Sequence, residues 1–110
     1  MGSLTHCDLE FQRLTKAFLA AHPEVRHEWR DVHHWHGNRI DLVCGVGLPT
    51  EVFASIGGQL VVGLTKGEHR DFEDFGRDIS DEELAREAFA HLVDLLRQHG
   101  HLDVSNRDDG

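Results

Sequence analysis

Two glycines at the centre of the chain constrain its fold more than any other feature. Gly57-Gly58 separates two largely apolar runs, Thr50–Ile56 and Gln59–Thr65. Glycine adopts the backbone angles that two-residue hairpin turns require, so the pattern predicts an antiparallel β-hairpin with Ala54 opposite Val61. Both faces of this hairpin are largely apolar, and its strands are therefore expected to be central in a sheet or covered on both sides.

A similar signal, Gly37-Asn38, predicts a second hairpin that joins Glu28–His36 to Arg39–Gly45. In the register that this turn imposes, His34 lies opposite Asp41 on one face of the hairpin. The other face holds the large apolar residues and is expected to face the core; it carries Trp29, Trp35, Ile40, Leu42 and Cys44, with His33 pointing the same way.

At both ends of the chain, the apolar residues follow the spacing of a helix and not the alternation of a strand. Apolar residues recur three and four positions apart from about Asp8 to Ala21, as in an amphipathic helix. A second helix is predicted to begin at the capping box Ser80–Glu83 and to stop at Gly100. Its apolar stripe consists of Leu84, Ala88, Phe89, Leu92, Val93 and Leu96.

These elements predict an α+β fold with a four-stranded antiparallel sheet made of two hairpins, in the order α-β-β-β-β-α. The simplest packing places both helices on one face of the sheet. The segment 68–76 is interpreted as a short edge strand that opens into a loop. We expect one domain over residues 1–100, followed by a flexible polar tail over 101–110, because 110 residues support a single modest core.

The charge balance restricts the classes of partner. The net charge is −9 with neutral histidines, so we expect neither nucleic acid nor an anionic membrane, which both attract clusters of lysine and arginine. No apolar run is long enough to span a bilayer, and the first residues lack the features of a secretory signal. A cytoplasmic protein with free thiols at Cys7 and Cys44 is expected, although a disulfide between them stays an open alternative.

Four histidines lie between His27 and His36, which raises the question of a metal site or a catalytic centre. His34 and His36 share one face of the predicted strand, and zinc could be held by these two with His69 as a further ligand. However, the predicted register places Arg39 opposite His36, where its charge would repel a metal ion. A metal- or small-ligand-binding domain is therefore the alternative, and no cofactor is the leading expectation.

Catalysis finds little support in the sequence. His34 with Asp41 could form an oriented general base, and Cys44 near His33 could act as a nucleophile. Neither pair belongs to a recognisable catalytic motif, and a glycine-rich phosphate loop is also missing from the sequence. We therefore expect a protein without enzymatic activity.

An acidic stretch follows the hairpins and surrounds two phenylalanines. Nine of the twenty acidic residues lie between Glu68 and Glu87. Some of them cap the last helix, and a solvated face is the plain alternative, but aromatic side chains among carboxylates are typical of a surface that binds a basic protein. The predicted binding residues are Asp71, Phe72, Glu73, Asp74, Phe75 and Asp78. At least one of the two phenylalanines is expected to be buried under the last helix.

The segment Gly67-Glu-His-Arg-Asp-Phe-Glu-Asp-Phe75, with hairpins before it and an acid-capped helix after it, resembles small immunity proteins of bacterial polymorphic-toxin and contact-dependent inhibition systems. The resemblance covers about residues 38–98. It implies a cytoplasmic protein that binds a cognate toxin domain, often a basic nuclease, and covers its active site. These families share no catalytic motif, so no residue role is transferred. A homodimer formed through an exposed sheet edge is a further possibility.

Overall fold

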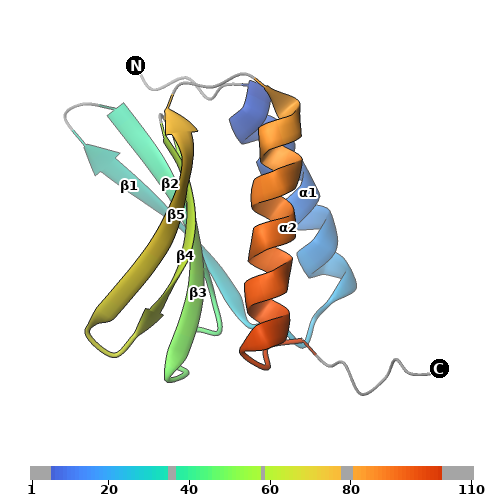
Figure 1. Ribbon diagram of the computed structural model, residues 1–110, viewed down its shortest axis with the longest axis vertical. Helices are drawn as coiled ribbons and strands as arrows, with labels where there is room; N and C mark the ends of the chain where they lie inside the picture. Colours follow the sequence, from blue (N-terminus) through green and yellow to red (C-terminus); the bar gives the residue numbers. More distant parts are fainter. Residues whose placement is uncertain (1–5, 35–36, 58, 78–80, 103–110) are drawn as a thin grey trace.

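A computed structural model describes residues 6–34, 37–57, 59–77 and 81–102, with only the backbone described at 32–34, 37–38 and 77 (Figure 1). The elements follow the chain as α1 (His6–Ala21), β1 (His27–His34), β2 (Gly37–Cys44), β3 (Thr50–Ile56), β4 (Gln59–Lys66), β5 (His69–Arg77) and α2 (Glu82–Gln98). The strands form one antiparallel sheet in the order β1-β2-β3-β4-β5. The predicted α+β class is confirmed.

Both helices cover the same face of the sheet, as predicted (Figure 1). The core lies between the two layers, where fully buried residues of α2 such as Leu92 and Leu96 meet Val52 and Val62 of the central strands. The opposite face carries no helix within the described residues. None of the described helices is long and apolar enough to cross a membrane.

The number of strands is corrected from four to five. The segment around residues 68–76, interpreted as a short strand opening into a loop, is a full strand, His69–Arg77. Leu60 pairs with Gly76 and Val61 with Asp74, so Phe75 is an extra residue in a β-bulge. Phe72 and Phe75 lie three residues apart and so face opposite sides of the strand, with Phe72 exposed and Phe75 against the core, which is why they do not mark a single apolar face.

The register of the central hairpin differs from the prediction by one residue. Ala54 pairs with Val62, where the two-residue turn at Gly57-Gly58 would place Val61. A slip of one residue exchanges the two faces of a strand. In the observed register the fully buried Leu60 and Val62 lie on the helix side, so that burial of the larger apolar residues outweighs the preferred turn length.

The predicted register of the first hairpin is also wrong. Asp41 pairs with Arg30 rather than with His34, and His34 pairs with Gly37, so residues 35–36 connect the strands. The slide is 34 − 30 = 4 residues, and an even slide leaves each side chain on its original face. The core face therefore keeps four of its predicted members, Trp29, Ile40, Leu42 and Cys44. Trp35, His36 and the side chains of His33 and His34 lie outside the described residues.

Helix α2 begins one residue later than predicted. Its N-cap is Asp81, whose carboxylate accepts a hydrogen bond of 2.9 Å from the backbone N–H of Glu83, while Ser80 lies outside the described residues. At the other end, Gly100 has a φ of 76°. The turn that it allows returns the backbone N–H of His101 to the carbonyl of Leu96 at 2.9 Å.

The residues that follow this turn belong to the folded body. His101 is only 8% exposed, and Leu102 lies against the core. The His101 ring fills the space beside Gly45, where even a Cβ atom would lie closer than 3.0 Å to it. Its Nε2 atom is buried and has no hydrogen-bond partner in the described part of the chain. The predicted tail thus contributes two residues to the domain, and 103–110 lie outside the description.

We expect the protein to lose stability as the pH falls below about 6.5, in part through His101. Burial lowers the pKa of this ring and the charge of His99 adds to the effect, whereas a hydrogen bond to the Thr50 backbone opposes it. The unfolded chain therefore takes up a proton more readily than the folded one. The stabilisation that comes from the neutral His101 ring is complete above the pKa of this histidine in the unfolded chain. It is lost as the pH falls towards the pKa of His101 in the folded protein.

Urea unfolding between pH 5 and 7.5 measures this dependence in the wild type and in His101→Gln. The glutamine side chain does not titrate, so the variant should have a shallower pH dependence, while the contributions of all carboxylates are common to both proteins. Parallel curves would show that His101 does not contribute.

Candidate functional site

Strand β5 forms one edge of the sheet, and its outer side is open. It pairs with β4 on one side and is last in the strand order. All residues from His69 to Asp74 are exposed, so no described segment covers them. An open edge of this kind presents unpaired backbone N–H and C=O groups to a partner.

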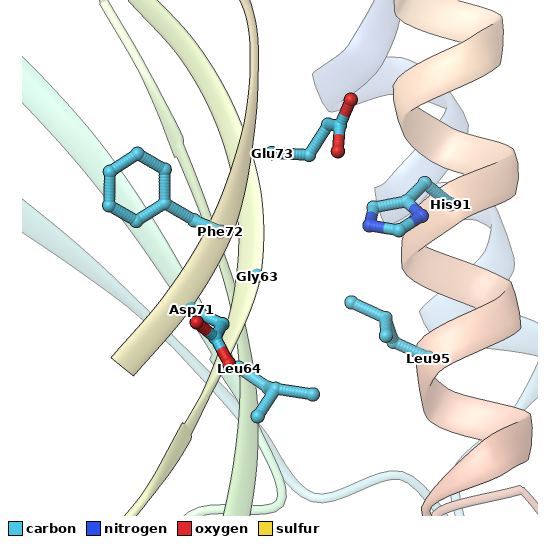
Figure 2. Close-up of a pocket in the computed structure, with 7 residues that line it drawn as sticks. All are labelled: Gly63, Leu64, Asp71, Phe72, Glu73, His91 and Leu95. Carbon is cyan, nitrogen blue, oxygen red and sulfur yellow. The ribbon is translucent and has the colours of Figure 1, made fainter. Parts of the chain in front are cut away.

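The pairing with β4 divides residues 71–74 of β5 between two faces, with Phe72 and Asp74 on the side away from the helices. Asp71 and Glu73 lie opposite Leu64 and Val62, which places their side chains on the helix side of the sheet. Phe72 lies opposite Gly63 and points to the face that carries no helix. Figure 2 shows Phe72 directed away from α2 and Glu73 directed towards it. The predicted binding residues thus form an edge with two different sides.

A groove of about 310 Å³ runs between β5 and α2. Leu64 of β4 and Leu95 of α2 provide its apolar surface, and the carboxylates of Asp71 and Glu73 line the strand side. His91 projects into the groove from α2 (Figure 2). Its position could be read from the helix stripe, because it lies three residues after Ala88 and four before Leu95. That this side of the helix faces β5 could not be predicted from the spacing.

The two phenylalanines of β5 have different environments. Phe72 is 58% exposed, which makes it the most exposed of the large apolar side chains described. Phe75 is partly buried against the core, and its ring centroid lies 5.9 Å from that of His91. Phe72 therefore remains as an exposed aromatic anchor, whereas Phe75 holds the strand against α2.

Local hydrogen bonds hold two of the β5 carboxylates. His69 Nε2 lies 3.1 Å from an Asp71 oxygen. Asp74 accepts from the amide of Gln59 at 2.7 Å and from the backbone N–H of Gly76 at 2.9 Å. Glu73 has neither a hydrogen bond nor an ion pair with the rest of the described chain. Asp78, the last predicted binding residue, lies outside the description.

Two of the three predicted histidine ligands, His34 and His69, lie far apart in the sheet. His34 ends β1 and His69 begins β5, at the two edges of a five-stranded sheet. The strands alternate in direction, so these two residues also lie at opposite ends of the sheet (Figure 1). No group of three or more metal-binding side chains occurs among the described residues, and His36 lies outside them.

The pairing of His34 with Asp41 as a general base is likewise wrong. The Asp41 carboxylate accepts hydrogen bonds from Arg39, at 3.0 Å, and from the Ser55 hydroxyl. An aspartate neutralised by arginine on an open sheet face is typical of a structural hydrogen-bond network.

The thiols of Cys7 and Cys44 are buried and free, which confirms the expectation of free cysteines. Burial raises the pKa of Cys44 to about 12. Burial, with the neighbouring charge of Asp8, raises the pKa of Cys7 to about 11. Because the thiolate is the reactive form, neither side chain is suited to nucleophilic chemistry.

Comparisons with models of protein families, with curated proteins and with solved structures found no match to this chain. The resemblance to immunity proteins therefore stays a prediction. The functional argument depends on the geometry and charge of β5 and of the groove beside α2.

Proposed function

We propose that this protein is a non-enzymatic protein-binding module whose exposed acidic strand β5 binds a basic protein. The observation that supports the proposal most directly is the exposure of Phe72, at 58%, on a strand whose neighbouring residues Asp71 and Glu73 carry exposed carboxylates on the other side. When a partner covers an exposed aromatic side chain, the apolar surface of the ring is removed from water, which favours binding. The carboxylates of the same strand select a positively charged partner.

The charge of the whole chain favours the same class of partner. A net charge of −9 accelerates the approach of a basic protein and repels nucleic acids and anionic membranes. The two free thiols are buried, and burial raises the pKa of each, so neither is a competing nucleophile. Binding is therefore the activity that this surface supports best.

The specific form that we propose is an immunity protein acting in the cytoplasm. Such a protein covers the active site of a toxin domain, and a basic nuclease is the kind of target that an acidic edge would attract. This form is supported by the resemblance of residues 38–98 and by the position of the acidic residues on an open strand edge.

We expect the gene of this chain to lie beside one that encodes a toxin-like domain. This domain should form a complex with the chain, and the association rate should fall at least about tenfold between 50 and 500 mM salt. Phe72→Ser should weaken this complex by about tenfold or more, since it removes the central apolar contact. Surface plasmon resonance with purified proteins measures both effects.

Leu48→Ser is the matched control, because Leu48 is also a large exposed apolar residue, at 47%, but lies between β2 and β3. Its affinity should equal that of the wild type. Equal losses in the two variants would contradict a role for β5. The proposal as a whole is wrong if neither the neighbouring gene product nor any protein of the native lysate binds at low salt.

A further inference from the structure

We infer that the β5 edge binds an extended segment in which basic and apolar residues alternate, and that the groove between β5 and α2 receives one basic side chain of this segment. The inference rests on the proposed function and specifies the chemistry of the partner. It follows from three features of the described residues: the open strand edge, the two different sides of β5 and the composition of the groove.

The open edge determines how the partner segment is bound. Along β5 every second residue directs its backbone N–H and C=O groups towards β4, and the groups of the other residues point outwards. An extended chain that lies beside β5 can bond to these outward groups and become a sixth strand. Backbone bonds of this kind provide affinity and leave selectivity to the side chains.

The two sides of β5 determine the side-chain pattern. Neighbouring residues of an added strand point alternately to the helix side and to the open side of the sheet. On the helix side they meet Asp71 and Glu73, and on the open side they meet Phe72 and Asp74. The Asp74 carboxylate already accepts hydrogen bonds from Gln59 and from the backbone of Gly76. The first set is complementary to lysine or arginine, and the second set to an apolar residue. An alternating basic and apolar sequence satisfies both sides at once.

The groove favours a long basic side chain over a short one. Its surface combines the apolar atoms of Leu64 and Leu95 with the carboxylates of Asp71 and Glu73. Lysine and arginine place their aliphatic part along apolar surface and keep the charged end in a polar environment. A volume of about 310 Å³ lies at the lower end of the range for small-molecule sites, which suits one side chain better than a cofactor.

On the open side of β5, the contact near Phe72 is apolar because the positive charge of Arg70 is not available to an acidic residue of the partner. The guanidinium carbon of Arg70 lies 4.2 Å from the centroid of the Phe53 ring, over which it is stacked. Phe53 is thereby 6% exposed although no helix covers this face. The positive charge of Arg70 is engaged with the aromatic ring, and Phe72 remains the accessible contact of the strand.

The test uses a seven-residue peptide with alternating lysine and valine, labelled for fluorescence anisotropy. The control peptide has the same composition with its lysines and valines in separate blocks, so that charge and hydrophobicity are equal. The alternating peptide is expected to bind at least about tenfold more tightly to the full-length protein. Equal affinities would overturn the inference, because charge alone would then explain binding.

Protein variants test the groove. Glu73→Gln and Asp71→Asn preserve the shape of the side chains and remove one charge each, and each is expected to weaken the alternating peptide by about five- to tenfold. Glu87→Gln removes the same charge from an exposed position of α2 outside the groove and is expected to change the affinity less than about twofold. Equal effects of the three substitutions would overturn the assignment of the groove.

Hydrogen exchange of the complex provides a readout that does not depend on charge. Addition of a strand should slow the exchange of the outward-pointing amides of β5 and leave the β1 edge unchanged. Unchanged β5 amides in a saturated complex would overturn strand addition. A toxin domain that binds the wild type, Glu73→Gln and Glu87→Gln equally would overturn the inference while the proposed function stands. A toxin domain that does not bind would overturn the immunity role, and the proposed function as a whole would fail if no protein of the native lysate binds either.

Discussion

Gly45→Ala is expected to lower the free energy of unfolding by about 2 to 4 kcal/mol, a large part of the 5 to 15 kcal/mol typical of a small domain. Gly45 has a φ of 75°, a conformation that L-residues rarely adopt. In addition, the new Cβ atom would lie closer than 3.0 Å to the His101 ring. The ring would have to leave its buried position, and the contact between the end of α2 and the β2–β3 loop would be lost.

Gly47→Ala separates the cost of the backbone strain from the cost of the clash with the His101 ring. Gly47 has a similar φ of 85°, but no atom lies within 4 Å of a Cβ built there. The control should therefore lose only about 1 kcal/mol from backbone strain. Urea unfolding of both variants, followed by circular dichroism, measures the difference. Equal stabilities would show that the His101 ring does not restrict this position.

Gly63→Ala is expected to cost about 2 to 4 kcal/mol and to separate β5 from the sheet. A Cβ atom at Gly63 would lie closer than 3.0 Å to the carbonyl oxygen of Asp71 and to the Cα and Cβ atoms of Phe72. Two of these three atoms belong to the backbone and cannot move without breaking the β4–β5 pairing. Since β5 carries the proposed binding edge, affinity for a basic partner should fall together with stability.

Thr65→Ala is the control, because Thr65 is the next residue of β4 on the same face and pairs with Arg70. It should reduce stability by less than about 1 kcal/mol. Hydrogen exchange locates the effect: the amides of β5 should lose protection in Gly63→Ala before those of β2 and β3. Uniform loss across the sheet would indicate general destabilisation in place of local release of β5.

The helices and the layer arrangement could be predicted because their apolar stripes are long and regular. The strand registers could not be predicted from the sequence. The slide of four residues between β1 and β2 preserves both faces, so the hydrophobic pattern of Trp29, Leu42 and Cys44 agrees equally well with the predicted and the observed pairing. In the central hairpin, the turn predicted from the glycine pair gave a register that differs from the observed one by one residue.

The candidate site was predicted in part. The acidic residues were identified by composition, but their division between two sides of β5 depends on the pairing of Glu73 with Val62 and of Asp74 with Val61. The strand itself was hard to predict because its two phenylalanines face opposite sides and do not form one apolar face. The groove requires His91 and Leu95 from a helix about twenty residues further along the chain, and only tertiary packing brings them to β5.

The acidic character of the β5 edge also governs how copies of this protein behave towards each other at high concentration. A long, open strand edge normally invites edge-to-edge aggregation. When two β5 edges approach, Asp71, Glu73 and Asp74 of one copy meet the same carboxylates of the other, and like charges oppose pairing. The same residues that attract a basic strand thus protect the protein in its free state from self-association along this edge.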